Sequence, residues 1–171
     1  MRTLAPYVPA GDMRTMAEFT AKNLGHDLTP EAVAEIRDLW PGTFIVKGVL
    51  HPADAETMVG IGADAIWVSN HGGRQVDIGV AAIDALPGIV AAVGDRTEII
   101  FDSGIASGAD VARAVALGAK MCFLGRGFVW GVAALGADGA GHAEFILRDE
   151  LSNVMSQLGC HRLDELKERL A

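Results

Sequence analysis

Four short runs of apolar and β-branched residues divide the middle of the chain, at residues 43–47, 65–70, 98–102 and 121–125. They lack the alternation of polar and apolar positions that marks a strand with one solvated face. This pattern predicts parallel strands that are covered on both faces. Segments with helical patterning separate them, at residues 52–61, 81–93 and 107–117. Pro87 and Gly88 predict a break in the second of these helices.

Helical patterning also flanks the strands. The pattern predicts one helix at 13–23, one at 29–39 that starts with Thr29 as N-cap and Pro30 in its first turn, and two near the end at 143–158 and 163–170. Strand, helix and strand in this rhythm are typical of βαβ units with right-handed crossovers.

An internal repeat supports this reading. A shift of 56 residues places Gly48 over Gly104, Asp54 over Asp110 and Gly62 over Gly118, so each copy is a strand that ends in Gly, a helix and a Gly-Ala turn. An open doubly wound sheet and a closed (β/α)₈ barrel both fit such a repeat. Four strands are half of an eight-stranded barrel, and a complete barrel takes roughly 250 residues.

Composition narrows the range of functions. The 171 residues are 50% hydrophobic and carry a formal net charge of −8, which disfavours non-specific binding to nucleic acid because phosphate neutralisation needs clustered Lys and Arg. Cys122 and Cys160 are far apart and have no CxxC spacing, so we expect reduced thiols. No apolar run approaches 18 residues and no signal peptide is recognisable, so the expectation is a soluble cytoplasmic protein with no strong membrane signal.

Reactive side chains follow each predicted strand. The first strand ends in Lys47, the second runs into His71 and Arg74, the third ends at Asp102 and the fourth ends at Gly125 and Arg126. Each could be an ordinary turn or a solvated side chain. In parallel α/β folds the carboxyl ends of the strands form one rim, however, so these groups would meet in one pocket. A cluster of cations in an acidic protein indicates an anionic ligand.

The motifs IVKGVL, VSNHGGRQVD, DSGI and LGR, at residues 45–50, 68–77, 102–105 and 124–126, resemble the FMN-dependent α-hydroxy-acid dehydrogenases and oxidases. This family includes glycolate oxidase, L-lactate dehydrogenase and mandelate dehydrogenase. The resemblance covers roughly residues 20 to 171 and corresponds to the C-terminal half of the family's TIM barrel. It implies an α/β half-barrel of four parallel strands with helices at 28–171, and a remnant of the active-site lid loop at 1–27.

The resemblance also implies roles for individual residues. His71 would be the base that removes a proton from a small L-2-hydroxy acid while two electrons pass to FMN, and Arg74 would hold the substrate carboxylate. The residues that would contact FMN share positions at the strand ends. They are Lys47, Ser69, Asp102, Ser103, Gly104, Ile105, Ala106, Gly125 and Arg126. The chain departs from the family at Ala106, where an Arg that helps to bind the phosphate is common.

Two functions of different class therefore stand at this point. In the first, the chain oxidises a 2-hydroxy acid of the lactate, glycolate or mandelate type together with a separate N-terminal half-barrel, or after self-association. In the second, it is a non-catalytic or decayed half-barrel that binds FMN or phosphate weakly, or only packs as a structural unit. Half a barrel leaves its outer strands unpaired, which favours association in both cases.

The other conspicuous side chains have structural interpretations. His51 and His142 are expected to be solvated, and Trp67 and Trp130 are expected to pack in the core. Cys122 lies in a predicted buried strand and is expected to be inert.

Overall fold

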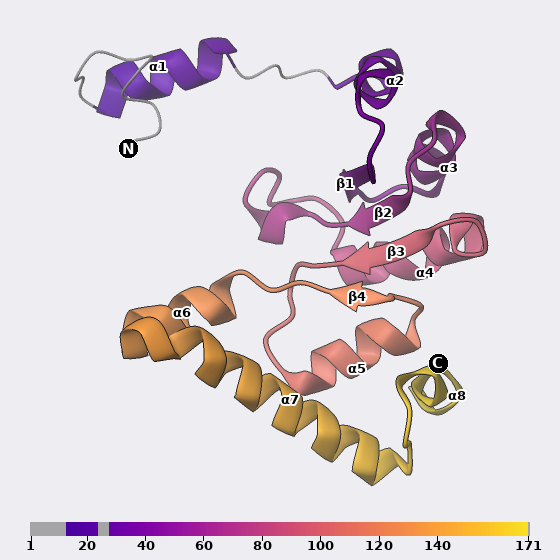
Figure 1. Ribbon diagram of the computed structural model, residues 1–171, viewed down its shortest axis with the longest axis vertical. Helices are drawn as coiled ribbons and strands as arrows, with labels where there is room; N and C mark the ends of the chain where they lie inside the picture. The colour runs from indigo at the N-terminus through magenta and orange to yellow at the C-terminus, as the bar shows by residue number, and fades with distance from the viewer. Residues whose placement is uncertain (1–12, 24–27, 171) are drawn as a thin grey trace.

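The computed structural model of the chain describes residues 13–23 and 28–170. Its centre is a parallel sheet with the strand order β1-β2-β3-β4. The strands are β1 (Ile45–Val49), β2 (Ala65–Val68), β3 (Glu98–Phe101) and β4 (Met121–Cys122). Their carboxyl ends point the same way (Figure 1). The predicted set of four parallel strands is confirmed.

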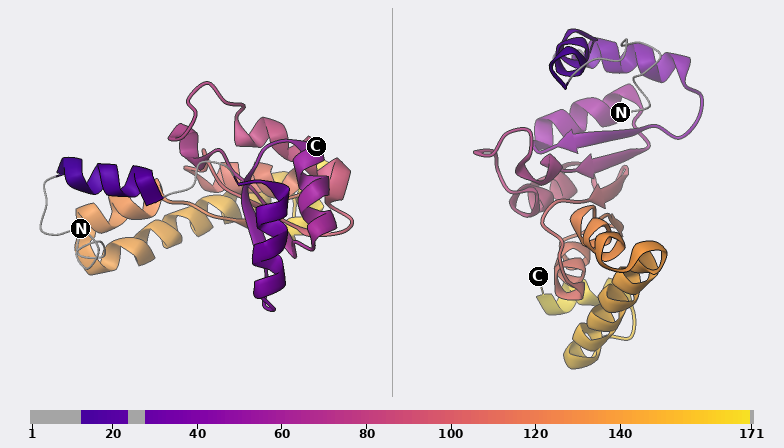
Figure 2. Two further views of the ribbon diagram at one scale, coloured as in Figure 1. Left: turned by 90° about the horizontal axis from the view of Figure 1, so that it is seen from above. Right: turned by 90° about the vertical axis from the view of Figure 1, so that its left-hand side faces the viewer.

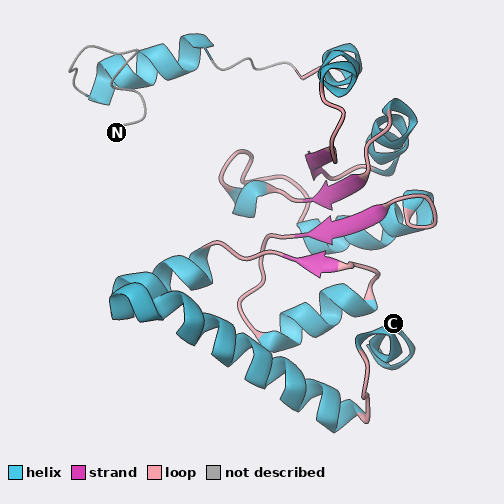
Figure 3. Cartoon of the chain, viewed as in Figure 1, coloured by secondary structure: helices cyan, strands magenta, loops and turns pink. Residues whose placement is uncertain are grey.

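Helices follow every strand (Figure 3). In chain order they are α1 (Met13–Asn23), α2 (Pro30–Leu39), α3 (Pro52–Ile61), the short 3₁₀ helix η2 (His71–Gly73), α4 (Ala82–Val93), α5 (Gly108–Ala116), α6 (Arg126–Leu135), η3 (Gly136–Asp138), α7 (Gly139–Leu158), η4 (Leu163–Glu165) and α8 (Leu166–Leu170). No helix among the described residues is long and apolar enough to cross a membrane.

The main core lies between the sheet and α4. Ile66 of β2, Phe101 of β3, and Leu86 and Ile89 of α4 are at most 1% exposed. Burial of side chains of this size stabilises the fold by about 1.5–3 kcal/mol each. It fixes the strands against one another and thereby holds their carboxyl ends in one row.

Local signals set the helix ends. Thr29 accepts a hydrogen bond from the amide of Ala32, and Ser107 and Asp110 form a capping box at the start of α5. His51 is exposed as expected, and its ring accepts a hydrogen bond from the Ala53 amide as the N-cap of α3.

The predicted break in α4 is wrong. The helix runs continuously from Ala82 to Val93 with Pro87 inside it. Proline removes one backbone hydrogen bond there, but the buried Leu86 and Ile89 on either side anchor the helix to the sheet. Packing therefore overrides the local penalty.

The region after the third strand also differs from expectation. The strand predicted at 121–125 is only two residues long, α6 was not anticipated, and α7 starts at Gly139 instead of residue 143. Trp130 on α6 is 65% exposed, so its assignment to the core is wrong for this chain. In the described sheet no strand follows β4, so none covers the apolar helix α6 on that side.

Three glycines bring the last helices close together. A Cβ on Gly131 of α6 or on Gly139 of α7 would overlap backbone atoms of the other residue. Gly108 at the start of α5 meets the backbone of Glu150 and Leu151 in the same way. The two further views show α6 and α7 lying side by side as a hairpin (Figure 2).

The outer strands β1 and β4 each have one neighbour in the described sheet. Apolar side chains are accessible at both, with Ile45 of β1 at 42% and Met121 of β4 at 54% exposure. Helix α1 buries none of its residues. The boundary expected at 27/28 stays a prediction, because residues 1–12 and 24–27 of the expected lid segment lie outside the described part.

Gly108→Ala should lower the free energy of unfolding by about 1–3 kcal/mol, because the added methyl group would have to displace the backbone of α7. The matched control is Gly141→Ala in α7, where no atom lies within 4 Å of the added carbon and the change should be neutral or stabilising by up to about 1 kcal/mol. Urea unfolding measures both. Equal stability of the two variants would contradict the close contact between α5 and α7.

Candidate functional site

A cavity of about 650 Å³ opens at the carboxyl ends of the strands. Its lining contains most of the residues singled out from the sequence. They are Lys47, His71, Gly72, Arg74, Gln75, Asp102, Ser103, Gly104, Ile105, Phe123, Leu124, Gly125 and Arg126. Of the expected site residues, Ser69 is fully buried beside the cavity and Ala106 is not part of its lining. The topology thus brings together groups that lie up to 79 positions apart, from Lys47 to Arg126.

Lys47 and Asp102 form an ion pair at the centre of this rim. The Lys47 ammonium lies 3.1 Å from Asp102 Oδ2 and donates a 2.9 Å hydrogen bond to Ser69 Oγ. Of the cations expected to cluster at this rim, Lys47 is therefore already paired with a carboxylate of the protein. Arg74 and Arg126 differ from it, because no carboxylate among the described residues lies within ion-pair distance of either guanidinium.

The carboxyl group of Asp102 is stabilised in its ionised form. Partial burial raises its pKa, but hydrogen bonds from Ser69, Ser103 and Lys47 and the positive charge of Lys47 outweigh that effect. The pKa of Asp102 consequently lies below its ordinary value. The side chain is an acceptor that connects three strand ends.

Asn70 shapes the turn that carries the predicted base. Its side-chain oxygen accepts hydrogen bonds from the amides of Gly72 and Gly73 at 3.0 and 3.2 Å, and its amide nitrogen donates to Val80 O at 3.3 Å. This role was not foreseen, although Asn before two glycines is a typical signal for a side-chain-capped turn.

The imidazole of His71 lies against the end of β1. A Cβ added to Gly48 would stand 3.2 Å from His71 Cε1, and Gly48 has a φ of +97°. Both the backbone angle and the space for the ring therefore require glycine at this position. His71 itself has a φ of +56° and donates its backbone N–H to Ser69 Oγ at 3.1 Å.

The start of α6 has several groups that are suited to an anion. Gly125 is its N-cap without a side-chain hydrogen bond, so the first amides of this ten-residue helix have no side-chain acceptor. Arg126 is the first residue of the helix and its guanidinium lies near Gly72, where an added Cβ would be 3.1 Å from the Arg126 terminal nitrogen. Free amides, the helix dipole and a guanidinium together favour a phosphate or carboxylate.

The loop before α5 has fewer free donors than expected. The amides of Ala106 and Ser107 both donate to Asp110 Oδ2, at 3.1 and 3.0 Å, and the amide of Gly108 donates to Glu150 Oε2 at 2.7 Å. Ala106 therefore offers neither a cation nor a free backbone donor to a phosphate. Gly125 and Arg126 at the start of α6 therefore keep more free hydrogen-bond donors than the loop before α5.

Phe123 lines the cavity and packs on Trp67, a contact that sequence reasoning missed. Trp67 and Phe123 pack with ring centroids 4.4 Å apart, and the Lys47 ammonium lies 5.1 Å from the centre of a Trp67 ring. Trp67, expected in the core, is half-buried in this packing. The neighbouring Cys122 has its pKa raised to about 11 by burial, which agrees with an unreactive thiol.

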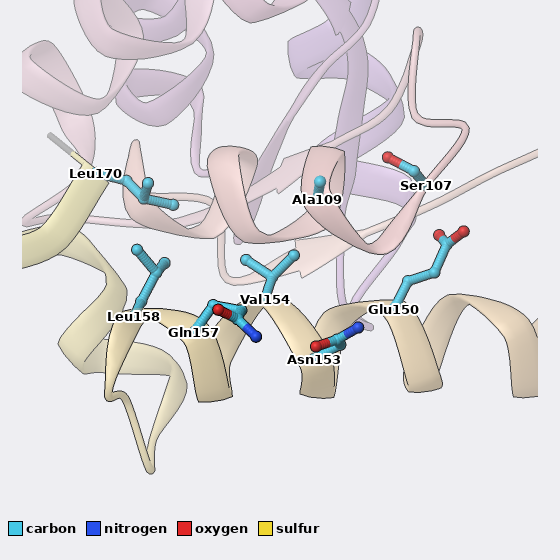
Figure 4. Close-up of a pocket in the computed structure, with 8 residues that line it drawn as sticks. All are labelled: Ser107, Ala109, Glu150, Asn153, Val154, Gln157, Leu158 and Leu170. Carbon is cyan, nitrogen blue, oxygen red and sulfur yellow. The ribbon is translucent and has the colours of Figure 1, made fainter.

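A second cavity of about 510 Å³ lies between α5 and α7 on the outer side of the sheet (Figure 4). It is lined by Ser107, Ala109, Glu150, Asn153, Val154, Gln157, Leu158 and Leu170. Glu150 points toward the start of α5, where it caps the helix. This lining contains no cation and none of the site residues expected from the sequence, so the strand-end cavity remains the candidate site.

The sequence and the structure of the chain are similar to those of known flavin-dependent enzymes. The family model described as FMN-dependent dehydrogenase matches residues 3–171. The chain belongs to the FMN-dependent dehydrogenase family. It is 47% identical over 131 residues to an L-lactate dehydrogenase of Caulobacter sp. (strain K31), a match that covers 77% of this chain and 34% of the relative. It is 40% identical to an L-lactate oxidase of Nostoc sp. (strain PCC 7120 / SAG 25.82 / UTEX 2576), with 86% of this chain and 40% of the relative covered.

The crystal structure of (S)-mandelate dehydrogenase, a monotopic membrane protein, superposes with a TM-score of 0.84 at 33% identity and covers 91% of this chain. The match takes in 41% of that chain. The chain thus spans less than half the length of each of these three relatives. The expected fold, a C-terminal half of an FMN-type TIM barrel, is confirmed.

Replacement of Asp102 by Asn should lower the free energy of unfolding at pH 7 by roughly 1.5–3 kcal/mol, the range for hydrogen bonds to a charged group. The folded-state pKa of Asp102 is lowered. Its stabilisation is therefore present above the unfolded-state pKa of about 3.9 and is lost as the pH falls through the lower folded-state value. The difference between wild type and Asp102→Asn should shrink as the pH falls below about 4.

Urea unfolding between pH 7 and pH 3 measures this difference. Asp95→Asn is the matched control, because the Asp95 side chain is 85% exposed and its contact with Arg96 is 3.9 Å long. A gap between wild type and Asp102→Asn that stays constant over the whole pH range would show that the ion pair does not contribute as inferred.

Proposed function

We propose that this chain is the C-terminal half-barrel of an oxidoreductase that converts a small L-2-hydroxy acid to the 2-oxo acid with FMN. The observation that carries the proposal is the meeting of His71 and Arg74 with Lys47, Asp102 and Arg126 around one cavity. A substrate of this class needs a base and a cation for its carboxylate. Its cofactor needs a phosphate site and a cation beside the ring.

His71 is the proposed base. Imidazole is suited to remove a proton near neutral pH because its ordinary pKa lies close to that range. Its ring lines the cavity, and the turn that carries it is held by Asn70 and Ser69. A base fixed in this way loses little orientational freedom on reaction.

Arg74 is the proposed clamp for the substrate carboxylate. It lies three residues after His71 and lines the same cavity. A planar guanidinium can bind a carboxylate through two parallel hydrogen bonds, which orients the α-carbon next to the base. The absence of a protein carboxylate beside Arg74 within the described residues leaves its donors available for this task.

The residues present fit FMN. The uncapped start of α6 with Gly125 and Arg126 would hold the phosphate, and the turn of Asp102, Ser103 and Gly104 would follow the ribityl chain. An added Cβ at Gly104 or Gly125 meets no atom within 4 Å, so both positions face open space. When bound, FMN supplies the two-electron acceptor. Lys47 is suited to stabilise negative charge on the reduced ring.

Completion of the barrel is part of the proposal. The outer strands β1 and β4 are each paired on one side in the described sheet, and apolar side chains are exposed along both edges. We infer that four further βα units pair with these edges, either from a separate N-terminal half-barrel or from a second copy. The alternative function, a half-barrel that binds FMN or phosphate without catalysis, is favoured by Ala106.

The first test is optical. The purified chain is mixed with FMN, its visible spectrum is recorded, and L-lactate, glycolate or mandelate is added without oxygen. Loss of the flavin colour supports catalysis. A yellow protein that keeps its colour supports the non-catalytic binding module. A chain that does not bind FMN, even at high FMN concentration, overturns FMN binding by the chain alone or by a self-associated copy, for both functions.

Substitutions assign the roles. His71→Gln should slow flavin reduction by at least about 100-fold and leave FMN binding in place, because only the base is lost. Arg74→Lys should weaken substrate binding by roughly tenfold or more, because a lysine cannot form the paired hydrogen bonds. His142→Gln and Arg113→Lys are controls at exposed positions. Equal effects at control and site positions would refute the assignment.

The unpaired edges predict association. The 17.9 kDa chain should elute at twice its mass or more in size-exclusion chromatography with light scattering. Ile45→Lys places a charge on the β1 edge and should shift the protein toward the monomer. Ile78→Lys, at a residue 97% exposed in the loop after η2, should not. A wild-type chain that elutes at monomer mass would count against completion by a second copy and leave the separate half-barrel.

A further inference from the structure

Ser103 adopts a backbone conformation that a serine rarely takes. Its φ is +80°, and among the described non-glycine residues only His71 shares a positive φ. Such a conformation strains a residue with a Cβ and persists where surrounding bonds enforce it. The next residue, Gly104, has a φ of +89° without strain. Position 103 could take the same turn more easily as glycine, so its hydroxyl group calls for an explanation.

The hydroxyl group makes two hydrogen bonds, one within its own loop and one to the turn after another strand. Ser103 Oγ donates to Asp102 Oδ1 at 2.7 Å and accepts the backbone N–H of Gly72 at 3.1 Å. Asp102 follows β3, whereas Gly72 lies in the turn after β2. The bond to Gly72 is therefore a tie between two loops that are 31 residues apart in sequence.

The tie acts on the peptide that follows the proposed base. The N–H of Gly72 belongs to the peptide unit between His71 and Gly72, so its direction is coupled to the backbone angle ψ of His71. Asn70 Oδ1 also accepts this N–H, at 3.0 Å, but Asn70 belongs to the same turn. Among the described residues, Ser103 is the side-chain partner of the Gly72 amide that comes from a different strand end.

We propose that Ser103 is a positioning residue for His71. Its hydroxyl group connects the Asp102 carboxylate, which is held by Lys47, to the turn that carries His71. The connection keeps the imidazole ring of His71 against Gly48. This inference rests on the proposed function, in which His71 is the base. It adds that the loop expected to follow the flavin ribityl chain and the loop that carries the base are mechanically connected through one hydroxyl group.

Two substitutions separate the tie from the strain. Ser103→Gly removes the hydroxyl group and the strain together, whereas Ser103→Ala removes the hydroxyl group and keeps the Cβ. Both variants should lose the tie, but Ser103→Gly should be the more stable of the two in urea unfolding. Ser152→Ala, at an exposed position of α7, is the control for loss of a serine hydroxyl group elsewhere.

The direct measurement is amide exchange in the full chain, followed residue by residue by NMR. In Ser103→Gly and Ser103→Ala the Gly72 amide should exchange about three- to tenfold faster, as expected for one lost hydrogen bond. The Gly73 amide, which is held by Asn70, should be unchanged and serves as an internal reference. The ring Hε1 signal of His71, assigned with His71→Gln, should shift in both variants and stay in place in the control.

The outcomes distinguish this inference from the proposed function. Faster Gly72 exchange with a shifted His71 ring signal supports the tie, whether or not the flavin is reduced. Unchanged exchange and an unchanged ring signal overturn it, even if the wild-type chain oxidises a hydroxy acid. Where flavin reduction is observed, Ser103→Gly should slow the reduction step about tenfold or more and leave substrate affinity, set by Arg74, nearly unchanged. An effect on affinity alone would contradict positioning.

Discussion

The carboxylate of Asp102 is the fixed point of the strand-end cavity. It receives the ammonium of Lys47 from β1 and the hydroxyl group of Ser103 from its own loop, and its pKa is lowered despite partial burial because these bonds and that of Ser69 favour the charged form. Backbone hydrogen bonds from the Asp102 amide to Val68 O and from the Phe123 amide to Phe101 O close the ladder at the carboxyl ends of the strands, and beyond them side chains hold the rim together. In this chain one acidic group connects three strand ends, and the turn with His71 depends on the same network through Ser69.

The apolar core and this polar network determine different features of the structure. Burial of Ile66, Phe101, Leu86 and Ile89 sets the spacing of strands and helices but specifies nothing about the chemistry at their ends. The charged network orients the side chains at the strand ends. Its hydrogen bonds are strong because the network is only partly exposed to solvent. Its donors and acceptors are largely satisfied, whereas Arg126 and the first turn of α6 keep unused hydrogen-bonding capacity within the described part of the chain. We therefore expect a ligand to bind at Arg126 and the first turn of α6, where hydrogen-bond donors remain free.

Much of this arrangement was accessible from the sequence, for identifiable reasons. Buried parallel strands can be recognised in a sequence as short runs of apolar residues. Lys47, His71 and Arg126 follow such runs, and the sequence predicts that they meet at one rim because the carboxyl ends of parallel strands lie on the same side of the sheet. The continuity of α4 through Pro87 was not predictable from local preference, because it results from packing against the sheet. The pairing of Lys47 with Asp102 also required three-dimensional distances. Asn70 could have been recognised from the glycines that follow it, whereas the strain at Ser103 has no signal in composition or spacing.

The stack of Trp67 and Phe123 has a consequence for spectroscopy. Trp67 Nε1 is buried without a hydrogen-bond partner among the described residues, whereas Trp40 and Trp130 are 55% and 65% exposed. The emission of Trp67 should therefore lie at shorter wavelengths than that of the two exposed indoles. Because this indole packs on Phe123 and lies 5.1 Å from the Lys47 ammonium, and both of these residues line the cavity, a yellow ligand in the cavity would absorb its light by energy transfer. Trp67 is thus an intrinsic optical reporter of the occupancy of the site.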